Sequence, residues 1–442
     1  MAQNFLACDR EQSWLMPPSL REWLPDEHLA WFVLDAVEEM DLAAFYGAYR
    51  QDGWGRAAHD PAMMVALLLY AYAVGERSSR GIERRCFEDV AFRVIAANQA
   101  PDHATLARFR VRHEQALAGL FGEVLRLCAA AGAVSVGVIA VDGTRIKANA
   151  ADRANFSYEQ LAREILAEAD AVDAAEDAEF GERRGDELPD ELADRTTRKA
   201  RLREAKARLE AEHAEKTREL EQWQREKDEY IARTGNRNGG WPPKPRPIGP
   251  APQGHINITD PDSRPVKTAT GFLQGYTAQA VATPEQIVIA ADVICGGNER
   301  HRLEPMISSA CDELTRAGIT ETPEVALADA GYWNSPHIQH LAGRGIRSLV
   351  KPDADKRKRP TRIRSGPLYE QMRDLLETDQ GKQLYRQRQA IIEPVFAHTK
   401  ITRRADRFQR RGLRACQAEW RLITATHNLL KLWRRSQTLQ PA

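Results

Sequence analysis

The arrangement of apolar and polar positions predicts a helical region at the start of the chain. Residues 27–130 repeat their apolar positions at helical spacing, and Pro61 opens a strongly apolar run at a place suited to the first turn of a helix. Further on, Asp102 precedes the basic segment 103–113 and is a suitable N-cap for a helix there. We therefore predict a helical N-terminal domain over residues 1–132.

The segment that follows Asp102 suggests a binding function for this domain. A turn followed by a short basic helix is the arrangement with which helix-turn-helix proteins contact DNA. Arg108 and Arg110 are the residues of this segment that we assign to DNA contact. The alternative is a helix whose arginines only reach solvent, and the sequence leaves both interpretations open.

Residues 136–141 change the period of the pattern. This short run of β-branched apolar residues is typical of a buried strand. Asp142, Gly143 and Thr144 follow the run and predict a tight turn, after which residues 144–148 would form the second strand of a hairpin.

Strands and helices alternate in the second half of the chain. The predicted elements are strands at 267–272, 275–281 and 287–293, a helix at 304–317, a strand that ends before Asp329, a helix at 335–343, a strand at 346–350, and tail helices through Glu393 and through residues 420–431. This order predicts an α/β fold in which helices cover a mixed sheet. We assign residues 133–150 and 255–435 to this domain.

The charged stretch at residues 151–254 interrupts the α/β domain. Leu161 and Leu202 belong to two amphipathic faces, and Gly185 and Pro189 lie between them, which favours an inserted helical hairpin. The end of the insertion is rich in Gly and Pro and reads as an extended linker.

Length and composition narrow the classes of function. A chain of 442 residues provides for two or three domains. No window reaches the ~18 consecutive apolar residues of a membrane span, and the first residues lack the pattern of a secretion signal. The six cysteines are scattered, which argues against a zinc site or a disulfide framework and fits a reducing cytoplasm.

The net charge of zero hides a strong segregation of charge. Residues 344–435 contain 24 Lys and Arg against 9 Asp and Glu, whereas residues 159–194 contain 3 basic and 14 acidic residues. Such segregation suggests a polyanion as the partner of the basic part. The alternative is that the two regions simply attract each other.

Three acidic residues are the strongest sign of chemistry. Asp142 and Asp329 each follow an apolar run, and Glu393 lies in a third one with Lys400 seven residues later. Converging carboxylates repel one another unless a hard cation neutralises them, and oxygen ligands suit Mg²⁺. Two such ions about 4 Å apart can promote phosphoryl transfer. Asp292 is the main rival for the second carboxylate.

Other polar residues lie in the same part of the sequence as Asp292. Glu299 follows a Gly-Gly turn, and we interpret Asn298 and His301 as structural groups near the site. The Ala-Gly-Tyr that follows Asp329 favours Asp329 over Asp292 as the second carboxylate.

These motifs together resemble the DDE transposases of bacterial insertion sequences. The resemblance rests on Val-Asp-Gly-Thr-Arg-Ile-Lys-Ala-Asn around Asp142, Leu-Ala-Asp-Ala-Gly-Tyr around Asp329 and Glu-Pro-Val-Phe-Ala-His-Thr-Lys from Glu393. It extends to residues 55–115 and 426–431, and it is greatest for the group called insertion sequence eleven-eighty-two. The resemblance implies a catalytic domain with a ribonuclease H-like fold.

The same resemblance implies the roles of individual residues. Asp142, Asp329 and Glu393 would be the catalytic acids and would bind two Mg²⁺ or Mn²⁺ ions. A related signature of Tyr, Arg, Glu and Lys is nearly present as Tyr385, Arg388, Glu393 and Lys400, although the interval between Arg388 and Glu393 is one residue longer. The insertion falls between the first and second acids, whereas in some transposases it falls between the second and third.

The sequence therefore predicts a metal-dependent DNA transposase. It would hydrolyse a phosphodiester at the element end and join the freed 3′-OH to target DNA. We expect a homodimer or larger assembly on double-stranded DNA in the cytoplasm, associated with the nucleoid. The residues assigned to DNA contact are Lys400, Arg388, Arg403, Arg404, Arg410, Arg108 and Arg110. Two alternatives remain, a nuclease of the same fold that cuts without joining and a catalytically idle DNA-binding or coiled-coil scaffold.

Overall fold

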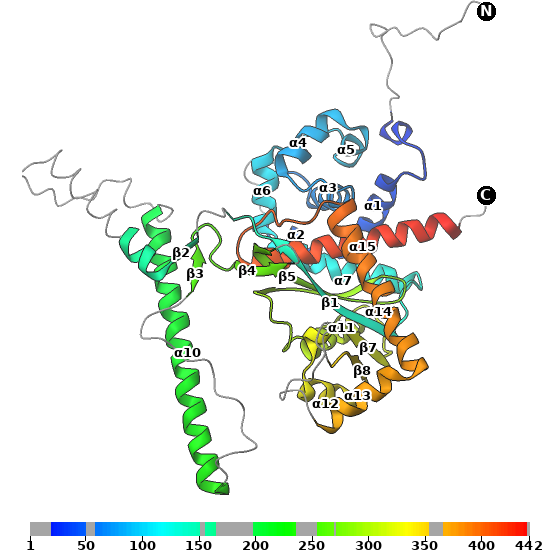
Figure 1. Ribbon diagram of the computed structural model, residues 1–442. Helices are drawn as coiled ribbons and strands as arrows, with labels where there is room; N and C mark the ends of the chain where they lie inside the picture. The colour runs from blue at the N-terminus through cyan, green and yellow to red at the C-terminus, as the bar shows by residue number, and fades with distance from the viewer. Residues whose placement is uncertain are drawn as a thin grey trace, which may run out of the picture.

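The computed structural model describes residues 19–49, 58–150, 155–164, 198–235, 254–268, 271–352 and 366–439. A central sheet lies between the N-terminal helices and the helices α12 and α13, and a long helix, α10, projects to one side (Figure 1). None of the helices in these ranges combines the length and apolar character that crossing a membrane requires.

The N-terminal region is helical, as its pattern predicts. Its elements are η1 (Leu20–Trp23), α1 (Leu29–Glu38), α2 (Ala43–Tyr46), α3 (Pro61–Ala73), α4 (Ser79–Glu88), α5 (Val90–Ile95), α6 (His103–Arg112) and α7 (Glu114–Ala130). Asp60 caps α3, where Pro61 is in the first turn, and Asp102 caps α6 by accepting a hydrogen bond from the Thr105 N–H. These caps satisfy backbone donors that have no partner within their own helix.

The sheet is mixed, with six strands. They are β1 (Val138–Lys147), β4 (Arg264–Thr268), β5 (Gly271–Ala282), β6 (Val288–Cys295), β7 (Val325–Ala328) and β8 (Arg347–Val350). The order is β4-β5-β1-β7-β8, and β6 also pairs with β5. Strand β1 is antiparallel to β5 and parallel to β7, which is in turn parallel to β8. This arrangement confirms a mixed α/β fold.

The predicted hairpin at Asp142 is wrong. Strand β1 continues through Asp142, Gly143 and Thr144 without a turn, and Gly143 pairs with Gln279 of β5. The strand that was expected from residues 144–148 is the second half of β1 itself. The Asp-Gly-Thr sequence suggested a turn, but Gly143 has no positive φ and is extended like its neighbours.

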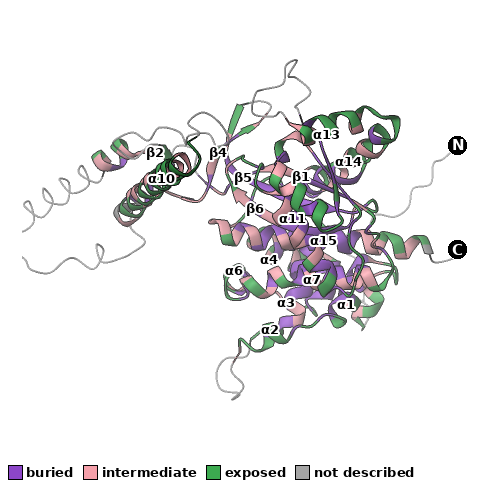
Figure 2. Ribbon diagram, turned by 90° about the horizontal axis from the view of Figure 1, so that it is seen from below, coloured by how far each residue is buried: buried purple, intermediate pink, exposed green. Residues whose placement is uncertain are grey.

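Helices cover the sheet and join it to the N-terminal region. They are α11 (Leu303–Arg316), η3 (Ala330–Tyr332), α12 (Ser335–Gly343), α13 (Pro367–Glu377), α14 (Asp379–Ala397), the π-helix η4 (His398–Thr402) and α15 (Leu413–Leu439). Helix α15 contacts α7, α3 and β6, and Figure 2 shows this region as largely buried. Buried side chains from α1 to α15 form one continuous core, so the N-terminal helices share their packing with the sheet.

The end of the chain secures the first residues of β6. The Asn428 side chain accepts a hydrogen bond from the Val288 N–H (2.8 Å) and donates one to the Val288 carbonyl (2.7 Å). The neighbouring His427 bonds the Gln286 carbonyl through Nε2 at 2.9 Å. The Thr-His-Asn sequence in α15 thus provides the partners that buried backbone groups at this place require.

The insertion has a small core of its own. Strands β2 (Asn155–Ser157) and β3 (His255–Asn257) pair at its base, and α10 (Arg198–Thr234) extends from there. The core consists of Leu161, Leu202, Ala205, Leu209 and Ile256. Residues 165–197 and 236–253 lie outside the described residues, and with them Gly185, Pro189, much of the first arm of the proposed hairpin and most of the linker.

Candidate active site

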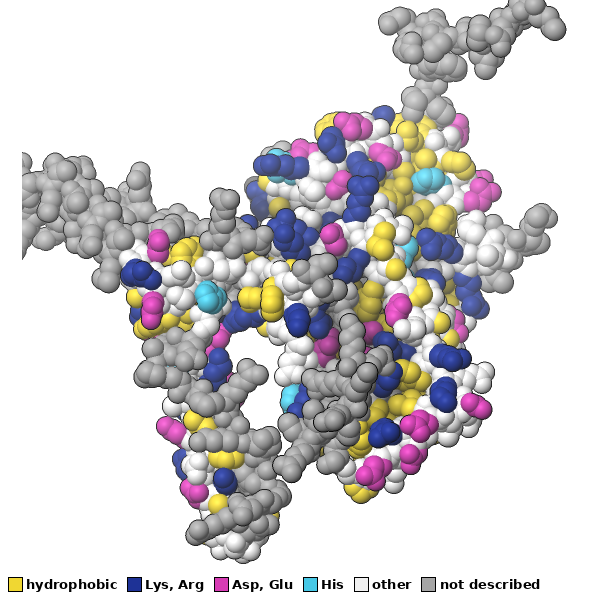
Figure 3. Space-filling model, in the orientation of Figure 1, with side chains coloured by type: hydrophobic (Ala, Val, Ile, Leu, Met, Phe, Trp, Pro, Cys, Tyr) yellow, Lys and Arg dark blue, Asp and Glu magenta, His cyan; other side chains and the backbone are white. Residues whose placement is uncertain are grey.

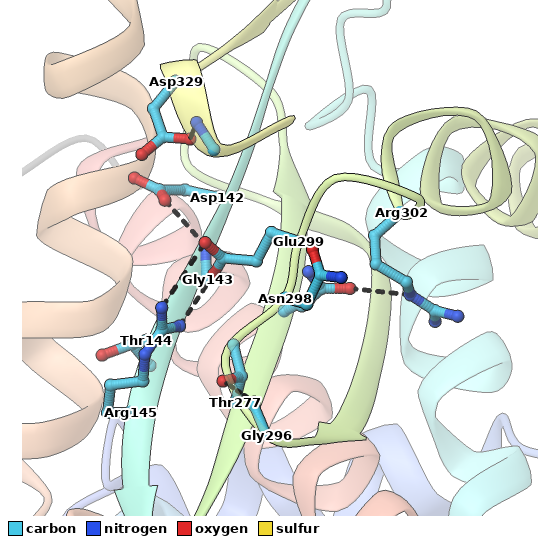
Figure 4. Close-up of polar contacts among 12 residues, drawn as sticks. Asp142, Gly143, Thr144, Arg145, Thr277, Gly296, Asn298, Glu299, Arg302 and Asp329 are labelled. Atoms are coloured by element: carbon cyan, nitrogen blue, oxygen red, sulfur yellow. Dashed lines mark hydrogen bonds and ion pairs between the residues drawn. The ribbon is translucent and has the colours of Figure 1, made fainter. Parts of the chain in front are cut away.

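Asp142 and Asp329 are brought together by neighbouring parallel strands. Val141 of β1 is paired with Ala328 of β7, so the residue that follows each of them lies at the same level of the sheet. Asp329 caps η3, and its Oδ1 accepts a hydrogen bond from the Gly331 N–H at 2.8 Å. Figure 4 shows the two carboxylates facing each other beside β1.

The surroundings of Asp142 disfavour its negative charge. Burial and, after it, the negative charge of Asp329 together raise the pKa of Asp142 to about 6, although the Arg388 guanidinium acts in the opposite direction. The side chain of Asp142 is 19% exposed. A bound cation would relieve this repulsion, because it would favour the charged form of both carboxylates.

Helix α14 and the π-helix η4 that follows it bring three further groups to these strands. Nη1 of Arg388 lies 2.6 Å from Oδ2 of Asp142, so this arginine neutralises part of the acidic charge. The Tyr385 hydroxyl donates a hydrogen bond to the Ala328 carbonyl at 3.2 Å. In η4, Lys400 Nζ donates to Thr144 Oγ1 at 3.2 Å and to the Arg145 carbonyl at 3.0 Å. The signature residues Tyr385, Arg388 and Lys400 therefore all reach β1 or β7.

Glu393 is also on α14, but it is exposed. None of the contacts found in the described parts of the chain joins Glu393 to Asp142 or Asp329. Its assignment as the third acid therefore stays a prediction.

Glu299 is the acidic residue that the structure places beside the two aspartates. Its carboxylate forms an ion pair with Arg145, with 2.7 Å between Oε1 and Nη1. Its negative charge contributes, with those of Asp142 and Asp329, to the raised pKa of the buried Tyr332. Sequence reasoning did not assign Glu299 to the site. The sequence contains one signal of a nearby side chain: a glycine follows each aspartate closely, Gly143 after Asp142 and Gly331 two residues after Asp329.

Asp292, the rival second carboxylate, has other partners. It forms an ion pair with Arg302 and accepts a hydrogen bond from Gln417 Nε2 at 2.9 Å. The two residues interpreted as structural have structural contacts. Asn298 accepts a hydrogen bond from the Arg300 N–H at 3.2 Å, and His301 contacts Asn334 at 3.2 Å.

The basic residues assigned to DNA fall into two groups. Arg403 is 3% exposed and donates hydrogen bonds to the Tyr72 and Ile423 carbonyls, and Arg110 is 7% exposed with its guanidinium over the ring of Tyr72. In this structure neither Arg403 nor Arg110 is accessible to DNA, and the expectation of phosphate contact is wrong for both. The physical reason is that their planar guanidinium groups serve the packing between α3, α6 and α15.

The remaining basic residues are more accessible. Arg404 and Arg108 are exposed, whereas Arg410 is part-buried in an ion pair with Glu114 at 2.7 Å. In the view of Figure 3, Lys and Arg side chains gather over α4 and α6 and elsewhere alternate with hydrophobic and acidic ones. Contact of DNA with Arg404 and Arg108 stays a prediction.

The acidic groups fit a hard cation only in part. In the described ranges, no three His, Cys, Asp or Glu side chains converge closely enough to hold a metal ion. The convergent ligands are the carboxylates of Asp142 and Asp329, whose oxygen atoms and mutual repulsion suit a cation such as Mg²⁺ that keeps several waters. Mg²⁺ is commonly bound by one or two protein carboxylates, so the ligand chemistry of Asp142 and Asp329 fits this ion.

Two segments of the chain match models of protein families. Residues 18–112 match the family described as Transposase domain (DUF772), and residues 349–433 match the family described as Transposase DDE domain. The second match includes α14 and η4. No curated protein and no solved structure matches the chain. Taken together, the two family matches indicate a DNA transposase and support the insertion-sequence DDE transposases as the family to which this chain is similar.

Proposed function

We propose that this protein is a metal-dependent DDE transposase that cleaves DNA at the ends of its element and joins the freed 3′-OH to target DNA. The observation that carries the proposal is the pair Asp142 and Asp329, in register on parallel strands of a chain that matches transposase models at both ends. The membership in the group of insertion sequence eleven-eighty-two is part of the proposal.

The topology supports a ribonuclease H-like catalytic domain. Three antiparallel strands, β6, β5 and β1, are followed by the parallel strands β7 and β8, with helices packed against them. In this arrangement the end of β7 is next to the middle of β1, which brings a carboxylate from each strand to one place. Residues 133–150 and 255–435 would form this domain.

Asp142 and Asp329 would hold the catalytic metal. When bound there, divalent cations activate the attacking oxygen and stabilise the leaving oxygen of the phosphodiester. The proposal includes two ions per site, with Glu393 as the third ligand. Because Glu393 lies on the same helix as Arg388, a small rotation or shift of α14 would carry both residues together.

Arg388 would also bind a phosphate group of the DNA. It now forms an ion pair with Asp142, and its buried Nε has no hydrogen-bond partner in the described parts of the chain. When Asp142 is neutralised by a cation, the guanidinium is free to donate two parallel hydrogen bonds to a phosphate group. Lys400 is held against β1 near the same place and would add positive charge beside the phosphate.

The partner is double-stranded DNA, bound by a homodimer or larger assembly in the cytoplasm and on the nucleoid. The test uses purified protein, MgCl₂ and labelled DNA that carries the sequences flanking the gene. We expect Mg²⁺-dependent cleavage at inverted repeats and joined products with a target plasmid. Asp142→Asn should abolish both reactions, and Asp292→Asn, a control with an ion-paired carboxylate elsewhere on the sheet, should not.

The same assay separates the alternatives. Cleavage without joined products would indicate a nuclease of the same fold. DNA binding with no cleavage under any divalent cation would indicate a scaffold and would contradict the proposal.

A further inference from the structure

Glu299 is a buried carboxylate that the proposed mechanism does not use. It lies in the loop between β6 and α11, just after the glycines 296 and 297, and only 9% of the residue is exposed. Its partner is Arg145 of β1, three residues after Asp142. Figure 4 shows the Glu299 carboxylate beside Gly143, near the Asp142 carboxylate.

Two glycines make room for this carboxylate. A Cβ at Gly143 would lie 2.4 Å from Oε1 of Glu299, and a Cβ at Gly331 would lie 3.0 Å from Oδ1 of Asp329 and 3.1 Å from Oε2 of Glu299. Neither glycine has a positive φ, so the backbone conformation alone does not require glycine at either position. Both positions therefore require a residue without a side chain. At Gly331 a side chain would lie against two carboxylates.

An ion pair with Arg145 does not explain the space at Gly331. The short contact of the pair, 2.7 Å from Arg145 Nη1, is made through Oε1 on the side of Gly143. Oε2, which faces Gly331, accepts only a longer hydrogen bond of 3.5 Å from Arg145 Nη2. Oε2 and the Asp329 carboxylate are like charges that both lie close to Gly331. Because Arg145 reaches Oε2 only at 3.5 Å, the two carboxylates repel each other unless a cation or a hydrogen-donating group lies near both.

We propose that Glu299 is a positioning residue that accepts hydrogen bonds from the water shell of a divalent cation held by Asp142 and Asp329. The inference rests on the proposed function. Mg²⁺ binds few protein carboxylates directly and keeps several waters, which need acceptors. Removal of such an outer partner typically weakens metal binding by about 10–100-fold. Because Gly331 has no side chain, a water of this shell can contact both Asp329 and Glu299.

The test measures Mn²⁺ binding to the full-length protein without DNA, by electron paramagnetic resonance of free Mn²⁺. Glu299→Gln removes the charge and keeps the volume, and Gly331→Ala fills the space and keeps every charge. We expect each variant to weaken Mn²⁺ binding by about tenfold or more. The matched controls are Gly137→Ala, where a Cβ meets nothing within 4 Å, and Asp292→Asn, and both should bind Mn²⁺ like the wild type.

Arg145→Gln separates a positioning role from a purely structural one. If Glu299 serves only as the partner of Arg145, Arg145→Gln and Glu299→Gln should lower the melting temperature alike and leave Mn²⁺ affinity unchanged. In our account, Arg145→Gln leaves Mn²⁺ affinity equal or higher, because it removes a positive charge next to Glu299, while Glu299→Gln lowers it.

The outcomes distinguish this inference from the proposed function. Mn²⁺ binding that is lost in Asp329→Asn but unchanged in both Glu299→Gln and Gly331→Ala overturns the role of Glu299 and leaves the metal site intact. A wild-type protein that binds no Mn²⁺ overturns the metal site, and the role of Glu299 with it.

Discussion

The acidic residues around β1 and the arginines at residues 403–414 are both dense clusters of like charge, but they differ in their partners. Arg403 and Arg407 donate hydrogen bonds to backbone carbonyls, and Arg410 has an acidic partner. Asp142 forms an ion pair with Arg388, whose charge also acts on Asp329, and the pKa of Asp142 is nevertheless raised to about 6. Charged side chains whose partners lie within the protein stabilise the fold. Charged side chains that repel each other, as Asp142 and Asp329 do, are available to bind a ligand of opposite charge.

The largest effect is expected from removing one acid of the pair. Asp329→Asn should lower the rate of Mg²⁺-dependent DNA cleavage by roughly 10³-fold, because a catalytic cation contributes several kcal/mol to the transition state. DNA affinity, measured by fluorescence anisotropy, should stay within a few-fold, since Arg388, Lys400 and the other basic residues proposed to contact phosphates are unchanged in this variant. Near wild-type cleavage by this variant would remove Asp329 from the site.

The second prediction concerns the arginine cluster. Arg403→Ala should lower the free energy of unfolding by about 2–4 kcal/mol, because it removes the hydrogen bonds that the buried guanidinium donates to the Tyr72 and Ile423 carbonyls, together with its packing. The exposed neighbour Arg404 is the matched control, and Arg404→Ala should change stability by less than about 0.5 kcal/mol. Urea denaturation of both variants measures the difference. Equal stability of the two would show that Arg403 is not a structural residue.

The raised pKa of Asp142 gives a prediction for stability against pH. The folded protein binds this proton more tightly than the unfolded chain, whose aspartate has the ordinary value of 3.8. Without metal, the wild type should therefore lose stability as the pH rises from about 4 to about 6, by up to about 3 kcal/mol. Asp142→Asn should lack this loss. Chemical denaturation across this pH range in EDTA checks it, and identical pH profiles would contradict the assigned cause.

The smallest effect distinguishes two arginines of the same helix. Arg108 is exposed on α6, and Arg110 is buried against Tyr72. If Arg108 contacts a phosphate, Arg108→Ala should reduce the slope of log affinity against log salt by about 0.9. Arg110→Lys keeps the charge and should leave this slope unchanged. The measurement is a salt titration of DNA binding, and an unchanged slope for Arg108→Ala would exclude α6 from the DNA interface.

The elements of the fold were largely predictable from the sequence, since they follow from local periodicity and capping. Asp102 and Pro61 begin helices as expected, and α12 has the predicted bounds 335–343. The continuation of β1 through Asp142 was not predictable, because Asp-Gly is usually a turn signal. Here Gly143 instead leaves room for Glu299, a residue far away in sequence. Local pattern does not show that a glycine provides space for a distant side chain.

The site was predictable only in part for the same reason. The order of Asp142 and Asp329 along the chain suggested their pairing, and the register of β1 with β7 brings them side by side. The burial of Arg403 and Arg110 could not be read from a count of charges, because it depends on tertiary contacts of the guanidinium groups, those of Arg403 with the Tyr72 and Ile423 carbonyls and that of Arg110 with the Tyr72 ring. Glu299 was seen in the sequence but had no motif that linked it to the aspartates.

The most direct test of the central claim is a crystal structure of the protein soaked with MnCl₂, with anomalous scattering used to locate Mn²⁺. The account predicts a peak between Asp142 and Asp329 at metal-ligand distances, about 2.1 Å for the corresponding Mg²⁺. It also predicts that Arg388 moves away from Asp142. The absence of a peak at this place, with the ion pair between Arg388 and Asp142 intact, would contradict the claim that these two carboxylates form the catalytic metal site.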